Sequence, residues 1–104
     1  MNTRLKHIEN WVDLARQANW STALLAKECG VSVRTLQRFF AKRIRTSPKV
    51  WLAEKRRRRA VELLVQGSSV KETAMLVGYK QASTFSREFK KRCGRYPTAY
   101  ALET

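Results

Sequence analysis

The sequence predicts an all-α fold in which two helix-turn-helix subdomains, about seven helices in all, are joined by a long central helix. Apolar residues recur at helical spacing in successive segments, and no segment alternates with the period of two of a half-buried strand. A stretch of good or neutral helix formers, residues 48–66, runs without a breaker. The segments on either side of this stretch share one order of helix-ending, core and helix-opening residues.

The central helix is marked at both ends. Ser47 is a favourable N-cap, and Pro48 is tolerated at the first helical position because an N–H there has no helical partner. Gly67 suits the left-handed backbone just past a helix. These signals divide the chain into a first helix-turn-helix lobe (residues 1–46), a connecting helix (47–66) and a second lobe (67–104).

The first lobe is expected to contain three helices. The first covers residues 5–17, the second follows the N-cap Ser21 and ends at Gly30, and the third follows the N-cap Ser32 and covers residues 33–42. The residues expected to face the core, helix by helix, are Leu5, Ile8, Trp11, Val12 and Ala15, then Leu24, Leu25 and Cys29, then Val33, Leu36, Phe39 and Phe40.

The second lobe repeats this pattern. Ser69 and Glu72 have the spacing of a capping box, and Gly78 ends the helix that follows. After a turn at residues 79–81, a helix over residues 82–93 ends at Gly94, and a short helix covers residues 97–102. The residues expected in this core are Val70, Ala74, Leu76, Val77, Phe85, Phe89 and Tyr100.

An internal repeat connects the two lobes. Ala26 and Gly30 recur 48 positions later, whereas later positions recur after 49, so the second copy carries one extra residue in its turn. The pairs at the longer offset are Arg38 and Arg87, Phe40 and Phe89, Lys42 and Lys91, Pro48 and Pro97, and Trp51 and Tyr100.

The charge of the chain predicts a polyanionic partner. Among 104 residues, 22 are Lys or Arg and 8 are Asp or Glu, a formal charge of +14. Such an excess opposes compaction unless a polyanion offsets it. Nucleic acid is the favoured partner and an anionic membrane surface is the rival. No apolar run approaches the roughly 20 residues of a membrane span, and the first residues lack a signal peptide's apolar region, so a cytoplasmic protein is expected.

Catalytic and metal-binding patterns are missing from the sequence. Cys29 and Cys93 fit no metal-ligand spacing, and His7 is the single histidine. No Ser/His/Asp, Cys/His or carboxylate pair occurs at a workable spacing. We therefore expect no metal, no cofactor and no enzymatic activity.

Each lobe carries the signature of a helix-turn-helix. A small residue (Ala26, Ala74) permits close helix crossing, and a glycine four positions later permits the turn. This leaves the polar face of the next helix outward, with a size that fits a DNA major groove. The candidates for base contact are Arg34, Gln37 and Arg38 in the first copy and Ser83, Thr84 and Arg87 in the second. The candidates for phosphate contact are Ser32, Lys42, Arg43, Lys80, Gln81, Lys90 and Lys91.

Several motifs also resemble a known family. They are, in chain order, VRTLQRFF, Ser47-Pro48 with Trp51-Leu52, Ala60 with Leu63-Leu64, and GYKQASTFSREFKKRCGRYP followed by Tyr100. Over roughly residues 8–100 they resemble the DNA-binding domain of AraC/XylS-type transcription regulators. The resemblance implies two helix-turn-helix lobes on one long helix, bound as a monomer to an asymmetric DNA site with both recognition helices in adjacent major grooves. It places the base-reading positions on the same six residues.

The chain's length resembles the short, stand-alone branch typified by MarA and SoxS, although an excised domain is the alternative. For that branch, the resemblance implies transcription activation through contact with RNA polymerase. Three positions depart from the family pattern: Arg45 replaces a usual Gly, Arg57 a usual Leu or Met, and Ala101 a common terminal Arg. A different class, a non-specific architectural or RNA-binding module, remains the alternative function.

Overall fold

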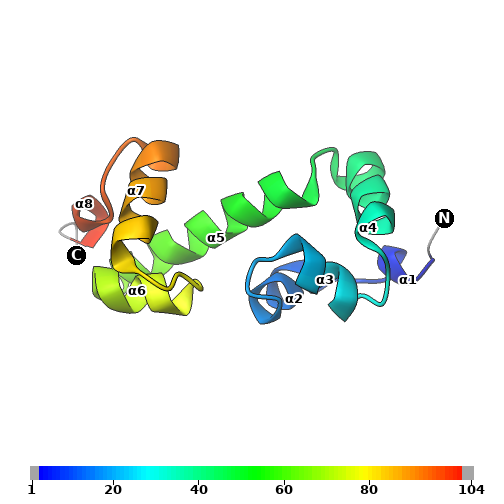
Figure 1. Ribbon diagram of the computed structural model, residues 1–104, viewed down its shortest axis with the longest axis horizontal. Helices are drawn as coiled ribbons and strands as arrows, with labels where there is room; N and C mark the ends of the chain where they lie inside the picture. The colour runs from blue at the N-terminus through cyan, green and yellow to red at the C-terminus, as the bar shows by residue number, and fades with distance from the viewer. Residues whose placement is uncertain (1–2, 102–104) are drawn as a thin grey trace. The chain divides into compact units, whose positions relative to one another are not determined.

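The computed structural model describes residues 3–101, and within that range it contains helices and no strands (Figure 1). The all-α prediction is therefore confirmed. The chain divides into two compact units, Met1–Lys55 and Arg56–Thr104. The helical elements are α1 (Thr3–Lys6), α2 (Trp11–Gln17), α3 (Thr22–Glu28), α4 (Val33–Phe39), the π-helical η1 (Phe40–Ile44), α5 (Pro48–Val65), α6 (Val70–Leu76), α7 (Ala82–Cys93) and α8 (Pro97–Ala101).

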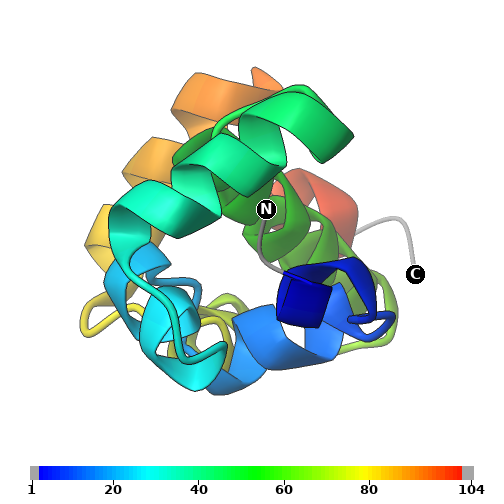
Figure 2. The ribbon, with the colours of Figure 1, turned by 90° about the vertical axis from the view of Figure 1, so that its right-hand side faces the viewer.

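The core of the first unit is organised around Phe40, whose side chain is fully buried. Its ring meets Trp11 edge-on at 5.1 Å between centroids and Trp51 edge-on at 5.5 Å. Edge-to-face aromatic pairs add to the free energy gained from burial. The contacts fix α4 and η1, which follow one another without a break (Figure 2), against α2 and the start of α5.

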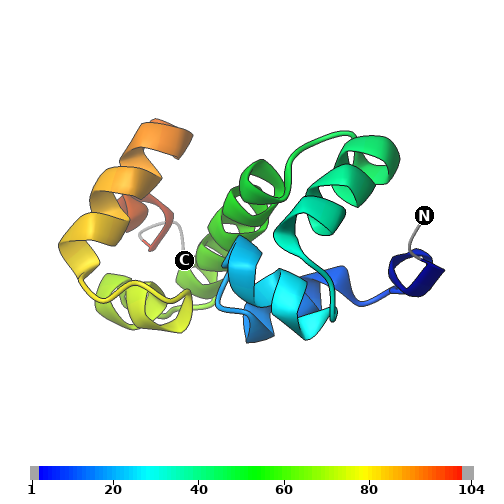
Figure 3. The same cartoon turned by 45° about the vertical axis from the view of Figure 1, so that its right-hand side comes forward.

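The core of the second unit repeats this arrangement around Phe89. Its ring lies 5.5 Å from Phe85 and meets Tyr100 edge-on at 5.4 Å. Figure 3 shows α6 and α7 joined by a short turn, and both helices also contact α8. Phe89 and Tyr100 are the repeat counterparts of Phe40 and Trp51, so the repeat seen in the sequence corresponds to the same ring contact in each unit.

The turn between the two helices of each helix-turn-helix has the same hydrogen bonds in both units. Val31 N–H donates to the Ala26 carbonyl at 3.0 Å, and Tyr79 N–H donates to the Ala74 carbonyl at 2.8 Å. Both belong to the motif in which a left-handed residue lets the chain turn back onto the last helical carbonyls. Gly30 (φ 69°) and Gly78 (φ 87°) supply that residue, as predicted.

The predicted caps are also confirmed. The hydroxyls of Ser21, Ser32, Ser47 and Ser69 each accept a backbone N–H from three residues further on. Gly67 and Gly94 have positive φ values just past α5 and α7. Most helix boundaries therefore lie within a residue or two of the predicted ones. The predicted last residue of the terminal helix, at position 102, lies outside the described residues.

The helix predicted over residues 5–17 is wrong as a single element. The chain leaves the helical conformation after α1 and begins α2 at Trp11, following Asn10 at φ −99° and ψ 48°. Leu5 and Ile8 still pack into the first core, as their helical spacing predicted, although no continuous helix joins them to Trp11. Burial of these side chains outweighs the helical propensity of a short exposed segment.

The third helix ends differently from the prediction. The π-helical turn η1 carries the helical segment to Ile44, with Arg45 N–H donating to the Phe40 carbonyl at 2.7 Å.

Four residues predicted to face the core are instead substantially exposed: Val12, Leu24, Val33 and Leu76. Each lies on a seven-residue helix, which buries only a narrow side, and the periodicity of apolar residues alone does not locate the centre of that side.

Arg45 ends η1 in the left-handed conformation, with φ 65° and ψ 30°. An L-residue other than glycine is strained there by about 1–2 kcal/mol, whereas glycine loses about 0.4–1 kcal/mol through its freer unfolded chain. We therefore expect Arg45→Gly to raise the free energy of unfolding by up to about 1 kcal/mol, measured by urea denaturation.

The control uses the repeat. Gly94 stands at the equivalent place after α7 with φ 76°, and a Cβ there would meet nothing within 4 Å. Gly94→Ala should therefore lower stability through backbone strain alone, by about 1 kcal/mol. Equal stability of the Arg45→Gly variant and the parent chain would show that the strain is relieved elsewhere.

Thr73 gives a second stability prediction. It is fully buried in α6, and its hydroxyl has no hydrogen-bond partner within the described residues. An unsatisfied buried hydroxyl lowers the free energy of unfolding by about 1–3 kcal/mol. The repeat counterpart of Thr73 is Leu25, an apolar residue that is equally buried. Thr73→Val, which keeps the shape, should raise the melting temperature. Thr98→Val at an exposed position of α8 should leave it unchanged.

Candidate nucleic-acid interface

The first candidate reading surface is the outward side of α4. Arg34, Gln37 and Arg38 are all exposed, and their spacing of three and four residues places them on one side of the helix. Leu36 and Phe40 are fully buried on the other side. The three predicted base-contacting side chains are thus presented together to solvent, and none of them is needed in the core.

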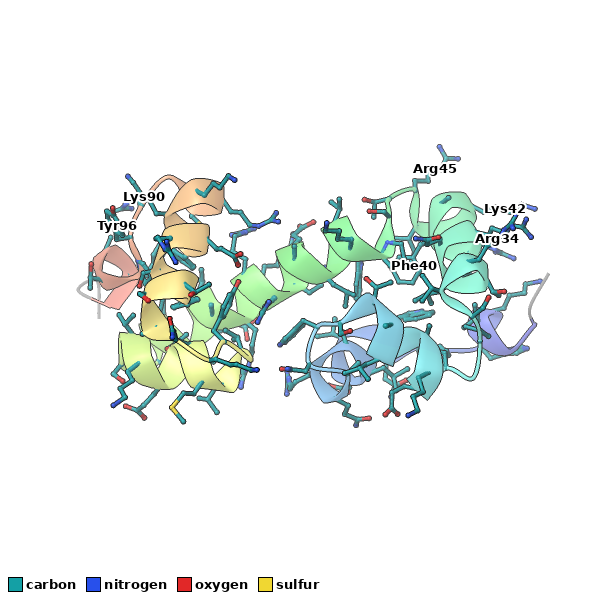
Figure 4. All side chains as sticks on the ribbon, viewed as in Figure 1. Arg34, Phe40, Lys42, Arg45, Lys90 and Tyr96 are labelled. Carbon is teal, nitrogen blue, oxygen red and sulfur yellow. The ribbon has the colours of Figure 1, made fainter. Side chains whose placement is uncertain are left out.

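The π-helical turn extends this surface by re-aiming the residues after Phe40. A π-type turn holds one more residue than an α-turn, so side chains beyond it are rotated relative to a regular helix. Ile44 consequently packs against the first core, while Lys42 and Arg43 are exposed. Figure 4 shows Lys42 projecting on the same side as Arg34 and Phe40 lying on the inner side.

The second candidate reading surface is the outward side of α7. Ser83, Arg87 and Lys91 are exposed and spaced by four residues, and Thr84 is half-buried beside them. Lys80 and Gln81, predicted to contact phosphate, are exposed in the turn that precedes α7. This surface offers one guanidinium, one ammonium and two short hydroxyl side chains, whereas α4 offers two guanidinium groups and an amide.

Lys90, a candidate for phosphate contact, also has partners within the protein. Its ammonium donates to the Gly94 carbonyl at 2.8 Å, and it lies 5.2 Å from the centre of the Tyr96 ring (Figure 4). A cation beside the last carbonyls of a helix is favoured by the helix dipole. One of the three N–H donors of Lys90 therefore stabilises the end of α7, and two are left for a phosphate.

The N-termini of α4 and α7 differ. The Ser32 hydroxyl accepts the Thr35 N–H at 3.1 Å and donates to the Thr35 hydroxyl at 3.0 Å, so its side chain is occupied by capping. Gln81 stands in the same position before α7, makes no side-chain cap bond and is exposed. The amide of Gln81 is thus the freer of the two to reach a ligand.

A polar chain behind α7 was not foreseen from the sequence. Arg56 Nε donates to the Val77 carbonyl at 2.7 Å, and its guanidinium lies 3.7 Å from the centre of the Tyr79 ring. The Tyr79 hydroxyl donates to Glu88 Oε2 at 2.6 Å. We call Arg56, Tyr79 and Glu88 the Arg-Tyr-Glu chain. Arg56 belongs to a run of five cations, residues 55–59, and sequence alone does not show that Arg56 reaches Val77 and Tyr79.

Comparison with known proteins identifies the architecture. A family model described as "Helix-turn-helix domain" matches residues 25–102, three quarters of the chain. A crystal structure described as a transcriptional regulator with an AraC-type DNA-binding domain, from Chromobacterium violaceum, matches with a TM-score of 0.73 and 27% identity over 89% of this chain and 87% of that one. The chain belongs to the AraC-type helix-turn-helix family. The predicted family resemblance is therefore confirmed.

Two curated relatives give the scale of the match. The virulence regulon transcriptional activator VirF of Yersinia enterocolitica is 30% identical over 84 residues, which are 80% of this chain and 31% of VirF. The transcriptional regulator RipA of Corynebacterium glutamicum is 38% identical over 71 residues, 68% of this chain and 22% of RipA. The chain thus spans about a third or less of these relatives. What it shares with them is a DNA-binding domain of transcription regulators, which is not an enzyme class.

The described residues were also compared with the requirements of a metal site and of a membrane span. Within residues 3–101 no cluster of three or more His, Cys, Asp or Glu side chains is arranged to hold a metal ion. None of the helices described is both long and apolar enough to cross a bilayer.

The Arg-Tyr-Glu chain predicts an unusual tyrosine titration. Burial, followed by the hydrogen bond to Glu88, raises the pKa of Tyr79 to about 12. Because the unfolded phenol titrates near pH 10, its contribution to stability is complete below about pH 10 and is lost as the pH rises through about 12. We expect the ultraviolet difference titration between the parent chain and Tyr79→Phe to have its midpoint near pH 12. A midpoint near pH 10 would mean that the phenol is solvated.

Proposed function

We propose that this AraC-type domain binds double-stranded DNA sequence-specifically and regulates transcription, with α4 and α7 as its two recognition helices. The observation that carries the proposal is the grouping of Arg34, Gln37 and Arg38 on the exposed side of a helix whose other side is core. We propose further that the helices enter adjacent major grooves of an asymmetric site bound by a monomer. The family match and the net charge of +14 support DNA as the partner.

The proposed base contacts follow from hydrogen-bonding geometry. Arg34 and Arg38 carry planar donor pairs that match guanine O6 and N7, and Gln37 matches the N6 and N7 edge of adenine. On α7, Arg87 is the one side chain of the proposed set with a donor pair, while Ser83 and Thr84 are short and accept several bases. The half of the site bound by α4 should therefore be the more strictly specified.

The proposed phosphate contacts surround these helices. They comprise Ser32 and Gln81 at the helix starts and five cationic side chains: Lys42, Arg43, Lys80, Lys90 and Lys91. Each neutralised phosphate releases counterions, so the logarithm of the binding constant should fall with the logarithm of salt concentration by about 0.9 per phosphate. This electrostatic part of the affinity is independent of sequence and is shared by specific and non-specific complexes.

The direction of regulation is proposed from the relatives. VirF is described as a transcriptional activator, and we extend that role to this chain, with RNA polymerase as the proposed target of the bound domain. Because the chain matches about a third of VirF, this extension concerns the DNA-binding part of the activity.

The alternative, a non-specific architectural or RNA-binding module, has less support. Proteins that bind single strands expose aromatic side chains on which bases stack. In this chain Phe40, Phe85 and Phe89 are buried, and Trp11 and Phe39 are half-buried against the first core. The largest aromatic surfaces are thus committed to the fold.

The decisive experiment is selection of binding sites from random double-stranded DNA, followed by fluorescence anisotropy at physiological salt. A single enriched motif, bound more tightly than scrambled DNA of equal length, is the expected result. Equal affinity for all duplexes would favour the architectural alternative, and preference for single-stranded RNA would favour the RNA-binding alternative.

Arg38→Ala tests the reading surface of α4. Loss of a two-donor contact to guanine should weaken binding to the selected motif by about 1–3 kcal/mol and relax preference at one or two base pairs. Arg16→Ala, which removes an exposed cation from α2, is the matched control and should leave the preferences unchanged. If Arg38→Ala lowers affinity equally for every sequence, Arg38 contacts phosphate and not a base.

A further inference from the structure

We infer that the Arg-Tyr-Glu chain is a positioning device that sets the rotation of α7, and thereby the base preference of the second reading helix. The inference rests on the proposed function, because Arg56, Tyr79 and Glu88 are inferred to orient a helix that is itself proposed to read DNA. None of the three is assigned a contact with DNA. They act through the side chains that α7 presents.

The Arg-Tyr-Glu chain connects three parts of the second unit. Arg56 belongs to α5, Tyr79 to the turn after α6, and Glu88 to α7. The Arg56 hydrogen bond ends on Val77, the residue that caps α6, so the same guanidinium holds the end of α6 and the ring of Tyr79. The Tyr79 hydroxyl then reaches across to Glu88. A line of directional contacts thus runs from the supporting helix to the reading helix.

Directional contacts are what fix a rotation. Phe85 and Phe89 dock α7 onto the core, but the free energy of burying apolar surface is itself non-directional and sets no preferred rotation of the helix about its axis. A hydrogen bond weakens steeply as its angle departs from linear. Glu88 immediately follows Arg87 and lies one turn beyond Thr84, so fixing Glu88 also fixes the direction in which these two side chains point.

The first unit has no such chain at the equivalent positions. Val31 stands 48 residues before Tyr79 and Phe39 stands 49 residues before Glu88, and both are partly buried hydrophobic residues packed against the first core. At these positions the first unit supports α4 through apolar packing. The second unit adds polar bonds to the apolar docking of α7. A defect in the polar chain should alter reading by α7 and leave reading by α4 intact.

Tyr79→Phe is the cleanest variant. It removes only the hydroxyl and keeps the ring, which contacts Phe85 at 5.4 Å between centroids and lies against Arg56. Glu88→Ala removes the other partner of the same bond, whereas Glu88→Gln retains an oxygen that accepts from the phenol. Val70→Ala is the control for general loss of stability, because Val70 packs on the second core from α6 and lies outside the chain.

The experiment repeats the binding-site selection with the parent chain and these variants. Base pairs whose preference is relaxed by Arg87→Ala define the half of the motif read by α7, and those relaxed by Arg38→Ala define the half read by α4. We expect Tyr79→Phe and Glu88→Ala to reduce discrimination about two- to tenfold in the α7 half alone, which corresponds to one net hydrogen bond. Glu88→Gln should restore the preference, and Val70→Ala should not change it.

Two results separate the claims. If the parent chain selects a motif and Tyr79→Phe keeps full discrimination in the α7 half, the positioning role is overturned and the proposed function stands. Equal loss of discrimination by Val70→Ala would also overturn it, since stability alone would then explain the effect. If the parent chain selects no motif, the proposed function fails and this inference fails with it.

Discussion

The hydrogen bond that closes the turn inside each helix-turn-helix is the constraint on which the rest of the structure depends. In both units the residue after a left-handed glycine donates to the carbonyl of a buried alanine five positions earlier. Any Cβ-bearing residue at the glycine would be strained, because the left-handed conformation crowds Cβ against the next carbonyl. The turn in turn sets where α4 and α7 begin, and therefore which of their side chains face outward.

The two units use this shared turn to support different exposed helix surfaces. In the first, Phe40 and its neighbouring rings hold a helix that displays Arg34, Gln37 and Arg38. In the second, Phe89 holds a helix that displays Ser83 and Arg87 and is additionally bound through Tyr79 and Glu88. Apolar packing gains free energy in proportion to buried area, whereas the polar chain adds little net stability and much directional control. The duplicated architecture thus leaves each copy free to specialise.

The end of α4 also differs from the equivalent end of α7. The π-helical turn brings Ile44 onto the core and leaves Lys42 and Arg43 exposed, and Arg45 completes it in a strained left-handed conformation. The equivalent end of the second helix uses Gly94 without strain, and Lys90 donates to its carbonyl. Strain in a folded chain persists where the surrounding structure over-determines it. Here the burial of Phe40 and Ile44 on either side of the turn provides that determination.

Sequence alone determined the features that depend on a few neighbouring residues. Caps such as Ser21 and Ser69, the glycines that end helices, the internal repeat and the outward Arg34, Gln37 and Arg38 were all readable, because capping and helical spacing act within one or two turns. Tertiary structure decided the break before Trp11, the π-helical turn at Phe40, the exposure of Leu24 and Leu76, and the inward turn of Arg56. These depend on which surface is covered by a distant part of the chain, and helical spacing along the sequence carries no information about that.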